Sequence, residues 1–173
     1  MMVSIQEKNL KPAIVKIMDN LYLLPSHKDF VNYPDFLELT FLPTEENYKE
    51  KRIAYFDYLL SDIEDEYDYI IFDVPPTLSI FTDTALYSTD YIVIVLQTQQ
   101  RSLDGAEAFW EYAQEFYNRY TNVDFDIAGI LPVLLKNDSG IDNQIIFDFH
   151  DTKVHKLYNE LANELLERTT GDN

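Results

Sequence analysis

The sequence predicts an α/β fold with a mostly parallel sheet flanked by helices, and two observations support this fold class. First, residues 69–74, 91–96 and 127–135 are strand-length runs with apolar side chains at nearly every position. Strands that are apolar on both faces are typical of a parallel sheet covered by helices. Second, apolar residues recur at helical spacing between and after these runs. Strands and helices that alternate in this way are joined by right-handed crossovers.

The segments before residue 69 predict one further strand, a loop and a helix. Residues 20–24 form a short apolar run that Pro25 ends, which indicates a strand. Residues 26–43 contain Pro34 and Pro43 as breakers and are expected to form a loop. Thr44 is the expected cap of a helix whose first turn holds acidic side chains. The apolar stripe of this helix is Ile53, Phe56, Leu59, Leu60 and Ile63.

Two longer helices are predicted in the second half of the chain. The stripe of the first is Leu103, Ala106, Phe109, Trp110, Ala113, Phe116 and Tyr117. The stripe of the second is Val154, Leu157, Tyr158, Leu161, Ala162, Leu165 and Leu166. We interpret the aromatic residues of the first stripe as core or interface packing rather than as base-stacking residues, which normally sit in a basic groove.

Composition fits one globular domain over residues 1–173. With 173 residues, of which 46% are hydrophobic, the chain can bury a core. The absence of cysteine excludes disulfides and thiolate metal sites and fits a cytoplasmic protein. No apolar run reaches the roughly 18 residues of a membrane span, and residues 1–10 lack the apolar core of a signal peptide.

The net charge of −18 argues against nucleic-acid binding by the chain as a whole. Binding to the phosphate backbone depends on lysine and arginine, so DNA contact would need a local basic patch. The candidates are thinly spread: Lys136, Lys153, Lys156 and Arg168. The alternative interpretation of the high net charge is that it keeps the protein soluble.

The most informative stretch is residues 67–76, Tyr-Asp-Tyr-Ile-Ile-Phe-Asp-Val-Pro-Pro. Asp73 follows an apolar run, and ligands of open α/β folds bind at the carboxyl ends of the strands. A carboxylate there holds Mg²⁺ in nucleotide sites, usually through water. Pro75 and Pro76 then fix φ and remove two backbone donors, so the chain leaves on a rigid path. On this evidence alone, a turn-capping role for Asp73 is an equal alternative.

The longer pattern resembles the ParA and MinD-like (deviant Walker) partition ATPase family. Residues 67–76 resemble its Walker B segment, and Thr-Asp-Thr-Ala-Leu at 82–86 with Thr-Asp at 89–90 resembles the helix that follows. The run at 91–96 and the stretch 97–105 resemble the next strand and loop. Upstream, residues 19–26 resemble the L-x-L-I-P-S strand, and 127–132 resemble the G-I-x-P strand. The resemblance covers residues 10 to 168 in the right order and spacing.

The resemblance implies a P-loop NTPase-like fold and a role in plasmid or chromosome partition, that is, DNA segregation. It implies ATP and Mg²⁺ as cofactors, with Asp73 holding the metal through water beside Pro75 and Pro76. It also implies a dimer, a ParB-like centromere-binding partner, non-specific nucleoid DNA and a cytoplasmic location. DNA contact is doubtful for so acidic a chain. A MinD-like membrane-bound protein is less favoured, because the last predicted helix is acidic and membrane-surface helices are usually rich in lysine and arginine.

The sequence departs from the family at the phosphate-binding loop. Such a loop needs the pattern G-x-x-x-x-G-K-[ST] at a helix N-terminus, and none of the glycines, Gly105, Gly129, Gly140 and Gly171, belongs to one. We therefore expect an incomplete fold without the N-terminal phosphate-loop unit, no ATP hydrolysis and no catalytic residue in this chain. Two hypotheses remain: a partition protein or fragment of one, and a non-catalytic ParA-like interaction module.

A second departure lies near the end of the chain. Residues 140–154 have to cover a region that is usually longer in the family. This leaves the adenine-contacting loop in doubt, and no base-binding residue is predicted.

Other polar clusters give weaker patterns. His150 and His155, with Asp148 and Asp151, have poor spacing for a metal site on one helical face. The acidic run Glu64, Asp65, Glu66 and Asp68 is typical of a solvated loop. Ser26, His27 and Asp29 are close in sequence, but local proximity is not the geometry of a hydrolase triad.

The missing loop also has a consequence for the sheet. In the family, the phosphate-loop strand lies between the two strands that correspond to residues 69–74 and 91–96. Because unpaired backbone groups are costly when buried, an empty slot between them is not expected. We therefore expect the two runs to pair directly, or a strand to be donated by another chain.

The charge generates a first testable prediction. At physiological salt, the isolated chain should not shift a non-specific DNA duplex in an electrophoretic assay, because its net charge of −18 repels phosphate. A salt-sensitive shift at low micromolar protein would contradict this. Loss of that shift in Lys153→Ala combined with Lys156→Ala would then locate the basic patch.

Overall fold

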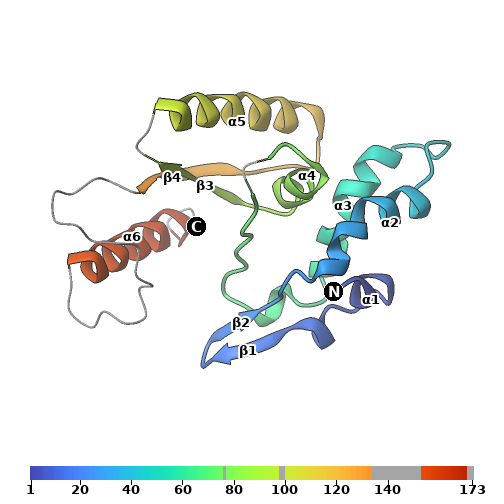
Figure 1. Cartoon of the computed structure of the whole chain (residues 1–173), viewed down its shortest axis with the longest axis horizontal. Helices are drawn as coiled ribbons and strands as arrows, with labels where there is room; N and C mark the ends of the chain where they lie inside the picture. The colour runs from blue at the N-terminus through green and yellow to red at the C-terminus, as the bar shows by residue number, and fades with distance from the viewer. Residues whose placement is uncertain (76, 98–99, 134–152, 171–173) are drawn as a thin grey trace. The chain divides into compact units, whose positions relative to one another are not determined.

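The computed structural model describes residues 1–75, 77–97, 100–133 and 153–170 (Figure 1). The chain divides into two compact units, each described here by itself. The N-terminal unit contains Met1–Thr89 and Glu115–Val123, and the C-terminal unit contains Asp90–Gln114 and Asp124–Asn173. Within the described ranges, no helix is both long and apolar enough to cross a membrane.

The N-terminal unit is mostly helical, with one short hairpin. Its elements are α1 (Met2–Gln6), η1 (Lys11–Ala13), β1 (Val15–Met18), β2 (Leu21–Leu23), η2 (Lys28–Asn32), α2 (Tyr33–Thr40), α3 (Tyr48–Leu60), η3 (Glu64–Glu66) and α4 (Ile80–Tyr87). β1 and β2 pair in antiparallel register, with Val15 opposite Leu23. Asn20 takes a positive φ of 62° in the turn between them, which asparagine tolerates better than most residues. The strand predicted at residues 20–24 is therefore confirmed as β2.

The expectation of a loop over residues 26–43 is wrong. These residues contain η2 and α2 instead. Pro34 lies in the first turn of α2, where its missing N–H removes no helical hydrogen bond. The proline that looks like a breaker in the sequence thus stands at the start of a helix.

Thr44 is not the cap of the next helix. α3 starts at Tyr48, after Asn47 at a φ of 57°. The carboxylate of Glu45 is used locally: it accepts a hydrogen bond from the Leu42 N–H at 3.1 Å and pairs with Lys51 at 3.1 Å. The predicted apolar stripe of this region is confirmed, since all five of its residues are buried.

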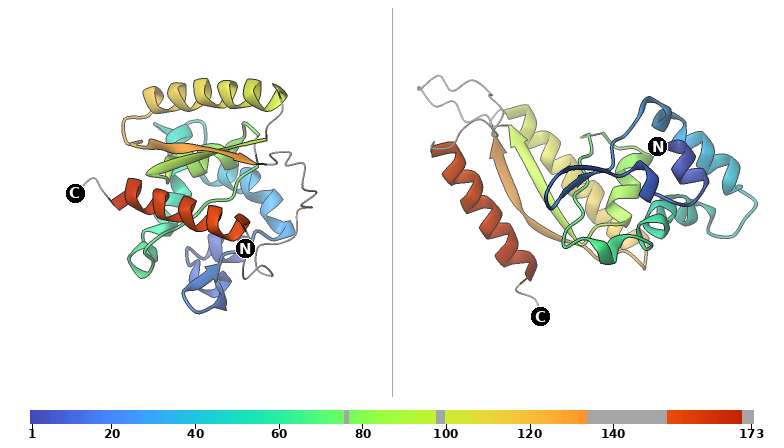
Figure 2. Two further views of the ribbon diagram at one scale, coloured as in Figure 1. Left: turned by 90° about the vertical axis from the view of Figure 1, so that its left-hand side faces the viewer. Right: turned by 90° about the horizontal axis from the view of Figure 1, so that it is seen from below.

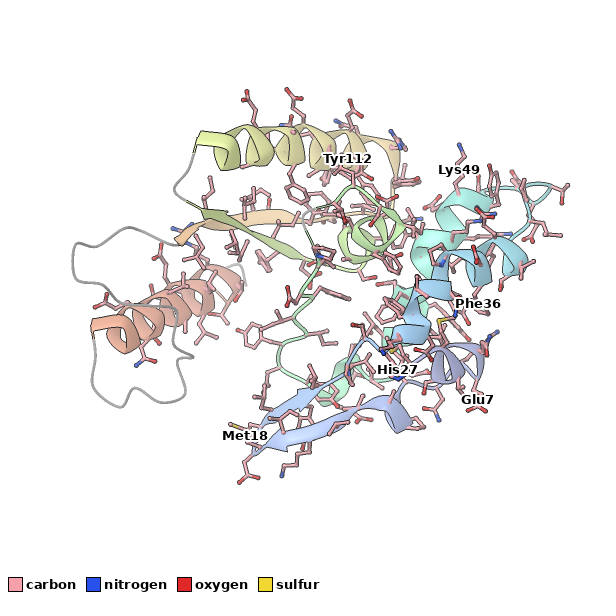
Figure 3. The ribbon with its side chains drawn as sticks, in the orientation of Figure 1. Glu7, Met18, His27, Phe36, Lys49 and Tyr112 are labelled. Atoms are coloured by element: carbon pink, nitrogen blue, oxygen red, sulfur yellow. The ribbon has the colours of Figure 1, made fainter. Side chains whose placement is uncertain are left out.

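The core of the N-terminal unit joins α1, α2 and α3. It consists of Met2, Ile5, Leu10, Tyr33, Leu37, Tyr55, Phe56, Leu59, Leu60 and Ile63. Phe36, labelled in Figure 3, packs its ring 5.6 Å from that of Tyr55. The Tyr55 hydroxyl donates a hydrogen bond of 3.0 Å to the backbone carbonyl of Ile5. This contact ties α3 to α1 through a buried polar group that has its partner.

The C-terminal unit contains the parallel pair of strands that the sequence predicts. β3 (Tyr91–Gln97) and β4 (Asp126–Val133) pair in parallel, and α5 (Gln100–Arg119) connects them. α5 lies on one side of this sheet and α6 (Lys153–Thr170) on the other (Figure 2). The strands at 91–96 and 127–133 and the two long helices are therefore confirmed. Residues 134 and 135 lie outside the described residues.

An irregularity in the β3–β4 register gives Arg168 a structural role. Ile92 lies opposite Ile127, but Val93 lies opposite Gly129, so Ala128 is the extra residue of a bulge. A bulge leaves its extra residue outside the regular ladder, and the Arg168 guanidinium donates to the Ala128 carbonyl at 2.6 Å. Arg168 also pairs with Glu164 at 2.5 Å. This arginine is therefore engaged within its own unit.

The strand predicted at residues 69–74 is absent from both sheets of the described chain. Among the described residues, the backbone groups of residues 70–74 make no hydrogen bond. The predicted direct pairing with residues 91–96 is consequently wrong, because β4 is the sheet partner that the described chain gives to β3. The sequence is suited to a strand with neighbours on both edges, and without them Ile71 is 89% exposed.

The packing of α2 generates a stability prediction. Leu37 is 1% exposed in the core, whereas Leu39 on the same helix is 81% exposed. Leu37→Ala should lower the free energy of unfolding by about 2–5 kcal/mol through lost burial and a cavity. The matched control Leu39→Ala should change it by no more than about 0.5 kcal/mol. Urea unfolding followed by circular dichroism measures both, and equal losses would contradict the placement of α2.

Candidate functional site

Asp73 lies between η3 and α4 and lines a cavity of about 530 Å³ inside the N-terminal unit. Its carboxylate is exposed and makes no ion pair or hydrogen bond with any described residue. The volume falls in the range of about 300–1,000 Å³ that is common for ligand pockets. Asp73 is thus an exposed anionic group in the lining of this cavity.

Two stretches of chain and a group of aromatic rings form the walls of the cavity. One stretch is residues 22–26, from β2 to the loop after it, and the other is residues 69–74. The rings belong to Phe30, Tyr33 and Phe81, with centroids 5.0 Å apart for the first two and 6.1 Å apart for the last two. The interior of the cavity is therefore mainly apolar, and Asp73 adds a charge to its lining.

Two hydroxyl groups in the cavity wall lack partners. Tyr33 is 0% exposed and Thr84 is 5% exposed, and neither hydroxyl has a partner with hydrogen-bond geometry. Burial raises the pKa of Tyr33 beyond its ordinary range, and the neighbouring Thr84 hydroxyl offsets only part of that rise. Tyr33 is therefore a neutral O–H donor near pH 7. A buried polar group without a partner is costly, which makes this pair informative.

The chain after Asp73 is held by a compact turn. The Thr77 N–H donates to the Pro75 carbonyl at 2.7 Å, and the buried Thr82 side chain donates to the Thr77 carbonyl. The Pro75 carbonyl thus accepts a hydrogen bond just before α4 begins. Pro76, the other proline of the predicted site, lies outside the described residues.

A metal ion at Asp73 would need other ligands. No group of three or more histidine, cysteine, aspartate or glutamate side chains suited to a metal exists in the part of the chain that the structure describes. A lone carboxylate fits Mg²⁺ that keeps most of its waters and shares the remaining ligands with a phosphate. The chemistry of Asp73 therefore fits one part of a magnesium–nucleotide site.

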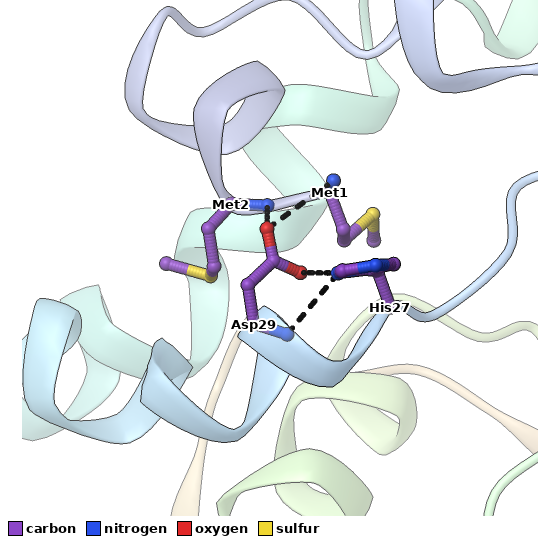
Figure 4. Close-up of polar contacts among 4 residues, drawn as sticks. All are labelled: Met1, Met2, His27 and Asp29. Atoms are coloured by element: carbon purple, nitrogen blue, oxygen red, sulfur yellow. Dashed lines mark hydrogen bonds and ion pairs between the residues drawn. The ribbon is translucent and has the colours of Figure 1, made fainter.

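Ser26, His27 and Asp29 do not form a catalytic arrangement. The His27 Nδ1 lies 3.2 Å from one oxygen of Asp29, while the other oxygen accepts from the Met2 N–H at 3.0 Å (Figure 4). Burial acts to raise the pKa of Asp29, but the Met2 hydrogen bond, the Met1 ammonium at 3.6 Å and His27 outweigh it and lower that pKa. Asp29 thus anchors the start of α1, and Ser26 lines the cavity instead.

Other predicted polar residues fall outside what the structure describes. Lys136, His150, Asp148 and Asp151 lie in the undescribed range, and the side chains of Lys153, His155 and Lys156 are likewise undescribed. The acidic run is exposed as predicted, and Glu66 within it pairs with Lys11.

Sequence reasoning missed Tyr33 and Thr84 as site residues. Tyr33 stands in a segment that the sequence predicts as loop, and Thr84 stands in an otherwise ordinary helix. Whether their hydroxyls find hydrogen-bond partners depends on tertiary packing, which no local sequence pattern indicates.

Comparison with known proteins gives a consistent family assignment. A family model described as an AAA domain matches residues 1–127. The sporulation initiation inhibitor protein Soj of Bacillus subtilis is 31% identical over 57% of this chain and 39% of its own length. A ParA family protein of Chlamydia pneumoniae is 29% identical over 66% of this chain and 42% of its own length. The chain spans less than half the length of these curated relatives.

Solved structures share the fold at lower identity. A plasmid partition protein from Borrelia burgdorferi matches 99% of this chain and 71% of its own, with a TM-score of 0.65 and 19% identity. Cobyrinic acid a,c-diamide synthase from Mycobacterium smegmatis matches 95% of this chain and 69% of its own, with a TM-score of 0.73 and 20% identity. These likenesses support the P-loop NTPase-like α/β fold. With the family model matching residues 1–127 and ParA proteins among its relatives, the chain belongs to the ParA-type partition ATPase family.

Proposed function

We propose that this chain acts in plasmid or chromosome partition as a ParA-like protein or a fragment of one, and residues 1–173 contain no phosphate-binding loop pattern. In this proposal, residues 1–173 form one ParA-like α/β domain. Asp73 is the Walker B carboxylate, and it holds Mg²⁺ through water when a nucleotide site is completed around it. Pro75 and Pro76 keep the segment after Asp73 on a fixed path.

The observation that carries this proposal is the position of Asp73. It directly follows an apolar segment, lines a cavity and has no partner among the described residues. Unpaired carboxylates are common on so acidic a chain, and Asp73 differs from them because it lines the cavity at the end of an apolar run. This position supports a role toward a ligand, and the family indicates that the ligand is hydrated Mg²⁺ with ATP.

Family membership also guides the proposed partners and location. We propose a ParB-like centromere-binding protein and a second subunit of the same kind as partners, in the cytoplasm. Nucleoid DNA is a weaker candidate, because Arg168, one of the few basic residues considered for it, is engaged with Ala128 and Glu164. The acidic chain as a whole disfavours phosphate.

A second candidate function is a non-catalytic ParA-like interaction module. It is favoured by the apolar side chains exposed along residues 69–74, which include Ile71. Exposed apolar surface of this kind marks sites of protein–protein contact. The two candidates differ in what Asp73 does, since only the partition ATPase role uses its charge.

Nucleotide binding tests the cofactor part of the proposal. Calorimetry with ATP and Mg²⁺ should show no binding at micromolar concentrations and no hydrolysis, because Asp73 alone supplies no contacts to the phosphates. Micromolar affinity that is lost in Asp73→Ala and kept in the nearby control Asp68→Ala would contradict the expectation. Both aspartates are exposed, so neither change should disturb the core.

Replicon stability tests the partition role itself. Asp73→Ala, introduced into the gene on its native replicon, should raise the loss of that replicon per generation, because the completed magnesium site would lack its carboxylate. Asp68→Ala should leave retention unchanged. Equal retention in all three strains would contradict the ATPase role and favour the interaction module.

A further inference from the structure

The carboxylate of Glu50 joins three segments of the N-terminal unit that are far apart in the sequence. Glu50 lies in the first turn of α3, and its Oε1 accepts a hydrogen bond of 3.3 Å from the Tyr87 hydroxyl at the end of α4. The same oxygen accepts a hydrogen bond of 3.0 Å from the side-chain amide of Asn122, which follows α5. One acceptor atom thus holds both the end of α4 and the chain after α5 to α3.

Aromatic packing supports the same junction. The ring of Tyr87 lies edge-on to that of Tyr120, with centroids 6.5 Å apart, and the Tyr120 ring lies 4.9 Å from that of Phe116 in α5. Phe116 is buried in turn. Burial also raises the pKa of Tyr87, so its hydroxyl is a neutral donor near pH 7. The ring of Tyr87 is therefore held by packing, while its hydroxyl is available to donate to Glu50.

The chemistry of Glu50 suits it to hold two elements at once. The nearby Glu45 pairs with Lys51 at the surface, whereas Glu50 is half-buried and accepts from two neutral donors. Hydrogen bonds to a carboxylate are stronger than those between neutral groups, and exposed ion pairs contribute little. A negative charge in the first turn of a helix is also favourable. Glu50 is therefore a better fixed point than the surface ion pairs around it.

The helix α4 is attached to its surroundings near both ends. Near its start, the Thr82 hydroxyl donates to the Thr77 carbonyl, and the Thr77 N–H donates to the Pro75 carbonyl at 2.7 Å. At its end, the Tyr87 hydroxyl donates to Glu50. A helix of eight residues is a stiff element about 12 Å long. A restraint at the end of α4 therefore also limits where its start can lie.

Asp73 stands two residues before Pro75, at the beginning of this connection. We infer that Glu50 is a positioning residue: it holds the end of α4, and α4 in turn fixes the segment from Asp73 to Thr77. Glu50 does not line the cavity beside Asp73, so it acts through α4 rather than on a ligand. Its consequence for partition rests on the proposed function, whereas its effect on the start of α4 does not.

Amide hydrogen exchange of the full chain tests this connection. The Asp83 N–H donates to the Ser79 carbonyl at 2.9 Å in the first turn of α4, and in Glu50→Ala it should exchange about tenfold faster. The amides of α2 in the same unit should keep their rates. The matched control Glu46→Ala, in the exposed turn before α3, should change neither. Unchanged exchange at Asp83 in Glu50→Ala, or an equal rise throughout α2, would overturn the inference.

Two further variants assign the effect to the hydrogen bond between Glu50 and Tyr87. Glu50→Gln keeps an acceptor oxygen in the same place, so exchange at Asp83 should stay within about threefold of the wild-type rate. Tyr87→Phe keeps the ring packed on Tyr120 and removes only the donor, so it should reproduce the effect of Glu50→Ala. Because both changes break one contact, the double variant should exchange no faster than the faster single variant. Fully additive effects would contradict the inference.

Replicon retention relates the positioning role to the proposed function. At equal protein levels by immunoblot, Glu50→Ala should raise replicon loss toward that of Asp73→Ala, while Glu50→Gln and Glu46→Ala should retain the replicon. Normal retention in Glu50→Ala beside loss in Asp73→Ala would overturn the positioning role and leave the proposed function standing. If neither variant affects retention, the partition role is contradicted, and unchanged exchange at Asp83 is then the result that overturns the positioning role.

Discussion

Pairing of backbone N–H and C=O groups decides which apolar segments of this chain become strands. An apolar segment forms a strand only where a neighbour meets its hydrogen-bonding groups. β3 has such a neighbour in β4, and α5 and α6 lie on the two sides of that pair. Residues 70–74 have none in the described chain, and they form an irregular wall of a cavity instead. Two stretches of similar composition thus differ because only one has a partner.

The helical core of the N-terminal unit holds this unpaired segment in place. Tyr33 packs against Phe30, Phe56 and Phe81, and Phe56 in turn lies against Phe72 within the unpaired stretch. These ring contacts position the segment without backbone hydrogen bonds. The groups without partners in the described chain are the backbone donors and acceptors of residues 70–74, two buried hydroxyls and the carboxylate of Asp73. In the proposed function, the carboxylate of Asp73 is the group of this arrangement that would hold Mg²⁺.

Local signals predicted much of the fold from the sequence. The continuous run at 91–96 and the stripe from Leu103 to Tyr117 are strong local patterns, and both elements formed as expected. The prediction of Thr44 as a helix cap was wrong, because α3 starts only at Tyr48 and Glu45 accepts a hydrogen bond from the Leu42 N–H instead. The prediction of a loop at 26–43 was wrong, because Pro34 occupies the first turn of a helix rather than ending one. The strand predicted at 69–74 did not form because a strand needs neighbouring strands, which a local pattern does not reveal. The unpaired hydroxyls of Tyr33 and Thr84 also depend on tertiary packing, so the sequence did not indicate them.

Amide hydrogen exchange of the isolated chain shows whether residues 70–74 are unpaired. These amides are expected to exchange near the rate of an unstructured peptide. In the same sample, the amides that join β3 to β4 should be protected, because they lie in a regular parallel ladder. Protection of residues 70–74 comparable to that of β3 would show that these residues are paired.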